Sequence, residues 1–502
     1  MRNEKINLAI LLLVSFLLSL YLYLRTYVIS LDGAFQYIPL AKNFVSGSLK
    51  EALVATGQQP FYSLLIALAS RAVPDFEIAG KLVASLLGIL IIFPVYFLGK
   101  RIFDEKIAFF SILLLTLHPY IRRFSADVLK ESTYLFFLAS AIWFSWKTIQ
   151  GEKKYPYFLT PFLSVLAYLV RPDGIEILLI VFFYILFVKK FHRPGERWWV
   201  VLFLFLSSAL LFLPYLIHLR ETTGTWTLSR TKSFTDFLGM VGIGGELSTS
   251  YKILFTLKIL NFEIFAVFHP FYLFLMAVGL FKKVSVPLKD GEKFLISFFS
   301  LHYLVLFLLV LNVTDWGGDD TSHAVFFSGR HVMPFLIFSI YWVGEGFMFI
   351  FEWLYRRIGS TKTAILSESK RSSMLAWLIL FSLTLAIVLP KTLKPQRYER
   401  LPEKWAGLWI KNQSGHGMSI LTTLPRVAYY ADGKLEYIDI KRDKPDRVEA
   451  LMAKKEILYC VIRGKEAIGF PREVGFIGKH FLKAIHFKQK GMDEVIVYKK
   501  VP

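Results

Sequence analysis

Acidic side chains that could handle protons stand beside several apolar stretches of this chain. Asp32 comes directly after the first stretch, and Asp127, Glu131 and Asp173 lie beside later ones. A carboxylate in such a place can act as a general base toward a hydroxyl or an amine. It can equally supply oxygen ligands to a divalent cation. We therefore take Asp32, Glu131 and Asp127 as candidate catalytic residues, and Asp32 and Glu131 as candidate ligands of a divalent metal. The ordinary alternative for each acid is a solvated charge at a membrane boundary.

Arginines accompany these acids. Arg122, Arg123, Arg171 and Arg330 also lie next to the ends of apolar stretches. The guanidinium group is planar and always charged, and its fork of donors matches phosphate oxygens. An ion pair between Arg171 and Asp173 is the structural alternative. The candidate substrate-binding residues are Arg330, His331, Arg171, Asp173, Arg122, Arg123, Lys81 and Tyr37.

Two of the remaining polar features carry less weight. Tyr37 follows Asp32 closely, and for it a packing role is the more ordinary interpretation. The segment "TDWGGDDTSHA" contains Asp315, Asp319, Asp320 and His323. Its spacing matches no tight metal-binding signature, so a solvated loop is the favoured interpretation.

The composition indicates what must position these residues. The chain has 502 residues, of which 55% are hydrophobic, and its mean hydropathy is +0.49, so it is a polytopic membrane protein. The formal net charge is +21. Because the Lys and Arg residues fall mostly in short loops between apolar stretches, we interpret them as topology signals and expect no nucleic-acid partner. The single Cys460 excludes an internal disulfide and a cysteine-based metal site.

The apolar stretches predict about eleven transmembrane helices. A hydrocarbon core of about 30 Å is crossed by a helix of about 20 apolar residues. Segment 60–73 is shorter and is expected to form an interfacial helix. The predicted spans are 6–24, 81–99, 107–121, 131–148, 157–170, 174–189, 198–217, 262–281, 294–313, 331–354 and 374–390.

The loop charges predict the orientation. Basic clusters follow every second span, which places these loops and the N-terminus in the cytoplasm. The other loops, including the long ones at 25–80, 218–261 and 314–330, are then extracytoplasmic. They carry the unusual acids and arginines, so the candidate site faces outward.

The character of the chain changes near residue 395. A polar segment that is expected to open with a helix leads into short strand-like runs: "MSILTTL", "RVAYYA", "LEYIDI", "EILYCVI" and "EVIVYKK". We therefore divide the chain into a transmembrane domain, 1–394, and a small α/β domain, 395–502. With the orientation above, the second domain is extracytoplasmic.

Several phrases together resemble a known family. These are the first-loop acid, "QQPFYSLLIAL", the stretch that runs from "KLVASLLGILIIFPVYFLGKRIF" to "HPYIRRFSADVLKES", "LVRPDGI" and "GRHVMP". The pattern is similar to the polyprenyl-phosphate-dependent glycosyltransferases of the GT-C fold, in particular to the protein-mannosyltransferase and aminoarabinose-transferase superfamily. The resemblance covers roughly residues 6–430, and it rests on the order of the phrases rather than on any single motif.

The resemblance implies roles for particular residues. Asp32 matches the first-loop acid of the family, which is the expected catalytic base, but Gly33 stands where the family often has a second acid. Glu131 matches the acid of the next outer loop, and Asp127 is its nearby rival. Arg330 matches the arginine of an Arg-Tyr-x-x-Pro phrase, expected near the carrier phosphate. His331 replaces the tyrosine of that phrase.

Arg171 and Asp173 match an Arg-Pro-acid phrase of the family, and the role implied for them is to shape the cavity. The implied activity is inverting transfer of a sugar from a polyprenyl-phosphate donor to a protein, lipid or glycan acceptor at the outer face of the cytoplasmic membrane. The expected partners are this donor and membrane lipids. The alternative is a polytopic transporter or an export component for a lipid-linked substrate. Transporters often show two similar halves and charges at the midplane, whereas here the charges lie at span ends and no repeat is visible.

The predicted orientation can be tested with reporter fusions. We expect an enzyme reporter that works only outside the cytoplasm to be active when it is fused after Pro502, because the positive-inside rule places the tail outside. The same reporter fused after Lys154, in a basic loop, should be inactive. The reverse pattern of activities would contradict both the orientation and an outward-facing site.

Overall fold

The structure is a computed structural model, and it describes most of the chain. The segment with Asp315, Asp319, Asp320 and His323 lies outside the described residues, as do parts of all three predicted long loops. The described residues are 2–47, 59–152, 155–188, 193–228, 248–314, 327–359, 366–439, 443, 445–469 and 471–501.

Helices account for the larger part of the fold. Apolar residues dominate their sequences, and Pro or Asp often stands at the first turn, where a missing or capped amide is tolerated. The first helices are α1 (Arg2–Leu24), η1 (Gly33–Tyr37), α2 (Ile38–Val45), α4 (Phe61–Ser70), α5 (Phe76–Leu90), α6 (Ile92–Ile102), α7 (Glu105–Leu117), α8 (Pro119–Ser125), α9 (Glu131–Ile149), α10 (Tyr155–Val170), η2 (Pro172–Ile175) and α11 (Glu176–Phe187). They are followed by α12 (Pro194–Thr223), α14 (Thr249–Phe268), α15 (Pro270–Lys282), η3 (Lys283–Ser285), α16 (Asp290–Val313), α17 (Gly329–Val332), α18 (Pro334–Gly359) and α19 (Leu366–Thr392).

The helices that could cross a membrane are fewer than the predicted spans, and two of the apolar stretches are bent. Within the described residues, six are long and apolar enough to cross a membrane, or eight if each bent pair counts as one span, so the predicted number of eleven is not reached by this measure. The predicted span 262–281 is wrong as a single helix, since α14 and α15 meet there at 96°. Likewise α7 and α8 meet at 61°. Both breaks come at a His-Pro pair, His118 and His269 each preceding a proline, and a residue before proline is disfavoured in the helical region.

Helix α18 is the most buried of the long apolar helices, and it packs most closely against α15. The two backbones touch because glycines face each other: a Cβ on Gly346 would collide with the Leu275 carbonyl, and one on Gly279 would collide with the Trp342 carbonyl. Small residues that let two helices approach in this way are typical of helix interfaces in membranes. This contact fixes α18, and α17, which carries Arg330, directly precedes it.

The C-terminal part of the chain contains a sheet of five strands in the order β2-β1-β3-β5-β4. Its first three strands in that order run parallel, and β5 runs antiparallel to β3 and β4. The strands are β1 (Ser419–Thr422), β2 (Lys434–Tyr437), β3 (Ile457–Arg463), β4 (Phe481–Phe487) and β5 (Val495–Lys500). The helices of this part are η4 (Tyr398–Arg400), α20 (Leu401–Ser414), α21 (Pro425–Tyr430), α22 (Pro445–Ala453), α23 (Gly464–Gly469) and α24 (Pro471–His480).

The predicted strands are only partly correct. The run "RVAYYA" forms helix α21 rather than a strand, because Pro425 occupies its first turn and starts a helix there. Strand β4 was not predicted, since Lys483 and His486 obscure its alternating pattern. A separate apolar core lies on each face of the sheet, one around Val461 and one around Ile462.

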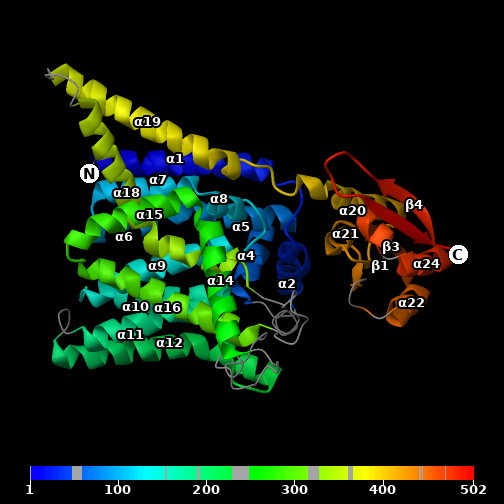
Figure 1. The fold of residues 1–502 in the computed structure, drawn as a ribbon. Coiled ribbons are helices and arrows are strands. Elements are labelled where there is room, and N and C mark those ends of the chain that lie inside the picture. Colours follow the sequence, from blue (N-terminus) through cyan, green and yellow to red (C-terminus); the bar gives the residue numbers. More distant parts are fainter. Residues whose placement is uncertain are drawn as a thin grey trace.

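The sheet lies at one end of the helical bundle, beyond the C-terminal ends of α1 and α19, and the segment after α19 leads into it (Figure 1). Helix α14 runs across the bundle at this same end, nearly perpendicular to most of its neighbours (Figure 1). A domain boundary at residue 395 and an extracytoplasmic position of the sheet stay predictions.

The contact between α15 and α18 gives a test of stability. We expect Gly346→Ala to destabilise the protein by about 1–3 kcal/mol, because the added methyl group forces two backbones apart. Thermal unfolding in detergent, followed by the exposure of buried Trp residues, measures this loss. Gly195→Ala is the matched control, since a Cβ at Gly195 meets nothing within 4 Å. Equal melting temperatures for the two variants would show that the close contact contributes nothing.

Candidate active site

Arg330 brings two of the predicted acids together. Its Nη1 forms an ion pair with Oδ2 of Asp32, and Oε1 of Glu131 lies 3.8 Å from the same nitrogen. Glu131 is only 2% exposed, whereas the Asp32 and Arg330 side chains are 21% and 34% exposed. Within the described residues, Glu131 Oε2 is buried without a hydrogen-bond partner. The group formed by Asp32, Glu131 and Arg330 is here called the Arg330 cluster. It is buried at Glu131 and partly exposed to solvent at Asp32 and Arg330.

The local backbone explains how Asp32 reaches this place. Asp32 caps the π-helical turn η1, and the amide of Gly33 donates to Ser30 Oγ at 3.0 Å. Ser30 Oγ in turn donates to the carbonyl of Val128 at 2.7 Å, which joins the first loop to the segment just before α9. A Cβ on residue 33 would lie 2.7 Å from Ser30 Oγ and 2.9 Å from Val128 Cβ. Glycine therefore fits here and an acid does not, which accounts for the Asp-Gly sequence.

The backbone that carries Arg330 is held by Arg171. Arg171 Nη1 donates to the carbonyl of Arg330 at 2.9 Å. Asp173 fixes Arg171 in turn, through contacts of 3.1 Å to Nε and 3.0 Å to Nη2. Burial alone would raise the pKa of the Asp173 carboxyl, but the Arg171 charge outweighs burial and holds this pKa below its usual value. The ion pair considered as the structural alternative is thus present, and it positions the Arg330 cluster.

A second pair, which was not predicted, is formed by His302 and Glu176 and holds the backbone of His331. His302 Nε2 lies 2.9 Å from the carbonyl of His331, and its Nδ1 lies 2.9 Å from Oε2 of Glu176. Both side chains are buried, on α16 and α11. The sequence did carry a signal, because a His and a Glu inside apolar helices need partners. Only the fold could show that they are partners of each other.

The other residues near the cluster include one that was not predicted. Lys130 directly precedes Glu131, and its Nζ lies 5.8 Å from the centre of the Tyr37 ring. Burial and the charge of Arg171 lower the pKa of Lys130 to about 8. Tyr37 is fully buried and meets the Tyr62 ring edge-on at 5.2 Å, which is a packing contact. Lys130 therefore adds a cation that loses its proton more readily than an exposed lysine does.

The surroundings of His331 do not suit a role in proton transfer. Burial, followed by repulsion from Arg171, lowers the pKa of His331 to about 3, so the ring is neutral at physiological pH. Its Nδ1 lies 3.3 Å from the amide nitrogen of Ser328, and the ring stacks on Phe327 with centroids 5.4 Å apart. His331 thus stabilises the short turn that presents Arg330.

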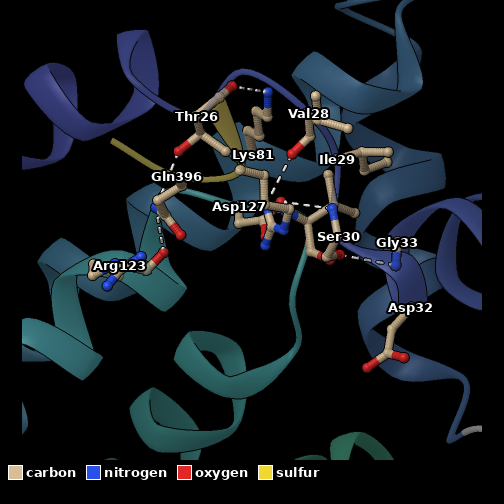
Figure 2. Close-up of polar contacts among 12 residues, drawn as sticks. Thr26, Val28, Ile29, Ser30, Asp32, Gly33, Lys81, Arg123, Asp127 and Gln396 are labelled. Carbon is tan, nitrogen blue, oxygen red and sulfur yellow. Dashed lines mark hydrogen bonds and ion pairs between the residues drawn. The ribbon is translucent and has the colours of Figure 1, made fainter. Parts of the chain in front are cut away.

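Asp127 lies outside the Arg330 cluster. It is fully buried, forms an ion pair with Arg397 and accepts a hydrogen bond from the Ser30 amide at 3.2 Å. Figure 2 shows Asp127 inside a network of main-chain contacts, while the carboxylate of Asp32 points away from that network. The position of Asp127 suits a joint between the first loop and the segment after α19.

Three predicted cations are also placed elsewhere. Arg122 is fully buried, and its Nη1 and Nη2 donate to Ser15 Oγ at 2.6 Å and to a main-chain carbonyl at 2.7 Å. Lys81 Nζ is paired with Glu77 at 2.6 Å. Arg123 accepts a hydrogen bond through its carbonyl and lines a different pocket. None of these contacts involves the Arg330 cluster.

The predicted metal site does not match the residues in place. Within the described part of the chain, no group of three or more His, Cys, Asp or Glu side chains could hold a metal ion. Asp32 and Glu131 both face the guanidinium of Arg330, whose charge opposes a cation between them. These two acids therefore form an arginine site rather than a divalent metal site.

Comparisons with known proteins agree with this architecture. Residues 57–218 match the family model of the dolichyl-phosphate-mannose-protein mannosyltransferases. The fold is similar to ArnT from Cupriavidus metallidurans bound to undecaprenyl phosphate, with a TM-score of 0.59, 12% identity and coverage of 98% of this chain and 97% of that one. The chain has the GT-C fold of these glycosyltransferases. The predicted resemblance is thereby confirmed.

Archaeal GT-C structures match as well. The oligosaccharyltransferase AglB from Archaeoglobus fulgidus, in complex with an inhibitory peptide and a dolichol-phosphate, gives a TM-score of 0.60 at 13% identity, over 99% of this chain and 74% of that one. The A. fulgidus enzyme in complex with Zn and sulfate gives 0.59 at 14% identity, over 98% and 73%. No curated protein sequence matches the chain. At these identities, the structural matches establish the GT-C fold alone.

The Asp127–Arg397 pair gives a second test of stability. We expect Asp127→Asn to destabilise the protein by about 3–5 kcal/mol, because it leaves a largely buried guanidinium without its counter-charge. Lys42→Met is the matched control: it removes the exposed pair with Asp432, which also joins the first loop to the C-terminal part, and it should cost at most about 1 kcal/mol. Thermal unfolding of both variants checks this difference. Equal losses would show that the Asp127 pair is not a joint.

Proposed function

We propose that this GT-C protein transfers a sugar from a polyprenyl-phosphate donor to an acceptor. The observation that carries the proposal is the convergence of Asp32 and Glu131 on Arg330. Two further findings support it. The family model that matches is that of the dolichyl-phosphate-mannose-protein mannosyltransferases, and two of the structural neighbours were solved with undecaprenyl phosphate or dolichol-phosphate.

Arg330 is the group that would receive the donor phosphate. Burial lowers the pKa of a guanidinium, but attraction to Glu131 and Asp32 outweighs burial and keeps Arg330 charged at every relevant pH. A fixed cation of this kind stabilises the negative charge that grows on a leaving phosphate as the glycosidic bond breaks. Because Arg171 and His302 hold the carbonyls of Arg330 and His331, the cation is positioned before the donor arrives.

Asp32 is then the general base. When the phosphate engages Arg330, the Asp32 carboxylate is released from its ion pair and can accept the proton of the acceptor hydroxyl or amine. The acceptor atom forms a bond to the anomeric carbon, and the bond from that carbon to the phosphate oxygen breaks with its electron pair remaining on the phosphate. Displacement in line inverts the anomeric centre. Buried Glu131 keeps Arg330 oriented during the exchange.

The proposed donor also fits the charge of the site. Three acids, Asp32, Glu131 and Asp173, face the cations Arg330, Arg171 and, when it is protonated, Lys130. A phosphate would add negative charge, which the ammonium group of Lys130 would help to balance. The reaction would take place at the outer face of the cytoplasmic membrane, with the N-terminus inside and the sheet outside. The sugar and the acceptor, whether protein, lipid or glycan, are set by contacts that the cluster alone does not define.

The decisive variant is Asp32→Asn. We expect it to reduce sugar transfer by at least about a hundredfold, since a general base contributes about 10²–10⁴-fold to a rate. Binding of the polyprenyl phosphate itself should change little, because Arg330 remains. Transfer is measured with purified protein in proteoliposomes and a radiolabelled polyprenyl-phosphate sugar, as label that leaves the organic phase.

Asp446→Asn, at an exposed position on α22, removes one carboxylate without touching the cluster and should transfer sugar like the wild type. If Asp32→Asn also kept wild-type turnover, Asp32 would have no part in the chemistry. If the wild-type protein released no label with any lipid-linked sugar tested but carried the intact lipid across the membrane, the transporter alternative would replace the transferase.

A further inference from the structure

A second basic pocket lies apart from the Arg330 cluster, between α8 and the segment that follows α19. Its volume is about 230 Å³. Basic and aromatic side chains dominate one part of its wall, and apolar side chains complete it. Its wall includes Tyr120, Arg123, Lys391 and Arg397.

The basic residues of this pocket differ in whether a carboxylate pairs with them. Arg397 is neutralised by Asp127. Within the described residues, neither Arg123 nor Lys391 has a carboxylate oxygen within 4.0 Å, and both side chains are only partly exposed. Lys391 Nζ lies 5.1 Å from the centre of the Tyr120 ring, a cation–π distance that fixes the ammonium at the wall. Two cations therefore face the pocket without an ion-pair partner among the described residues, and Glu399 acts on Arg123 only from a longer distance.

The pocket is also held in shape. The Gln396 side-chain amide donates to the carbonyl of Arg123 at 2.9 Å and to Thr26 Oγ1 at 3.0 Å. Thr392 Oγ1 donates to the carbonyl of Leu117 at 2.8 Å, which joins the end of α19 to the end of α7. Figure 2 shows Gln396 bound to Arg123, whose guanidinium points away from Asp127 and from Asp32. This pocket is thus built independently of the Arg330 cluster.

Its place in the fold indicates what it would bind. Lys391 stands in the last turn of α19, and Arg123 stands on α8, just after the bend in the α7–α8 pair. Both cations therefore lie where long apolar helices end, which is the level at which lipid headgroups meet a membrane protein. Unpaired Lys and Arg side chains beside aromatic rings at this level favour anionic headgroups.

We propose that the pocket lined by Tyr120, Arg123 and Lys391 binds the phosphate group of a membrane lipid. The ligand class is a lipid phosphate, from either a bilayer phospholipid or a polyprenyl phosphate. The proposal does not rest on the transferase function, because it concerns cations that lie outside the Arg330 cluster. It assigns a role to Arg123 that differs from that of its fully buried neighbour Arg122.

The test uses the full-length protein in a phosphate-free maltoside detergent, with bound lipids counted by native mass spectrometry. Phosphatidylglycerol, a polyprenyl monophosphate and inorganic phosphate are titrated separately. We expect the double variant Arg123→Gln with Lys391→Gln to lose about tenfold or more in affinity for one bound lipid. The matched control, Arg71→Gln with Lys434→Gln, removes the same charge from exposed positions and should bind like the wild type.

The arms of the experiment separate the sources. The lipid that binds more tightly to the wild type, and is lost from the double variant, identifies the ligand. If inorganic phosphate bound as tightly as either lipid, or if the double variant and the control kept equal lipid occupancy, the proposal would be overturned. Lys391→Met alone keeps Arg123 in place, so it supplies a folded variant should the double variant melt early. An unchanged lipid count in that variant would likewise overturn the proposal.

Discussion

The candidate site depends on one guanidinium shared by two carboxylates. Arg330 comes from the turn before α18, Asp32 from the loop after α1, and Glu131 from the first residue of α9. Three segments far apart in the sequence are thus brought to one place. The carbonyls of residues 330 and 331 are both held by other side chains, which fixes the backbone that carries this cation. The packing of α18 on α15 fixes the helix that directly follows this turn.

Much of the fold could be predicted from hydropathy, because a helix that crosses lipid must satisfy its own backbone and therefore appears as a long apolar run. The breaks were harder to see. The pairs His118-Pro119 and His269-Pro270 bend two apolar runs, and hydropathy averages over such bends. Run "RVAYYA" looked like a strand because its residues favour strands, yet Pro425 starts a helix there.

The types of residue in the candidate site could be predicted from the sequence, but only some of the particular residues could. Asp32, Glu131 and Arg330 were chosen by residue type and resemblance, and the fold brings them together. Asp127 and Arg122 had the same signals, yet each is buried with a structural partner, and no sequence pattern distinguishes these cases. His302, Glu176 and Lys130 were missed because their importance comes from contacts between helices. Gly33 shows the reverse: a departure from the family pattern has a steric cause in the packing of the first loop.

The most direct test of the central claim is a cryo-electron microscopy structure of the protein with a polyprenyl phosphate bound. We expect phosphate oxygens within hydrogen-bond distance of the Arg330 guanidinium, with the Asp32 carboxylate freed and facing the side from which an acceptor would approach. A phosphate bound elsewhere, with the ion pair between Asp32 and Arg330 still intact, would contradict the account.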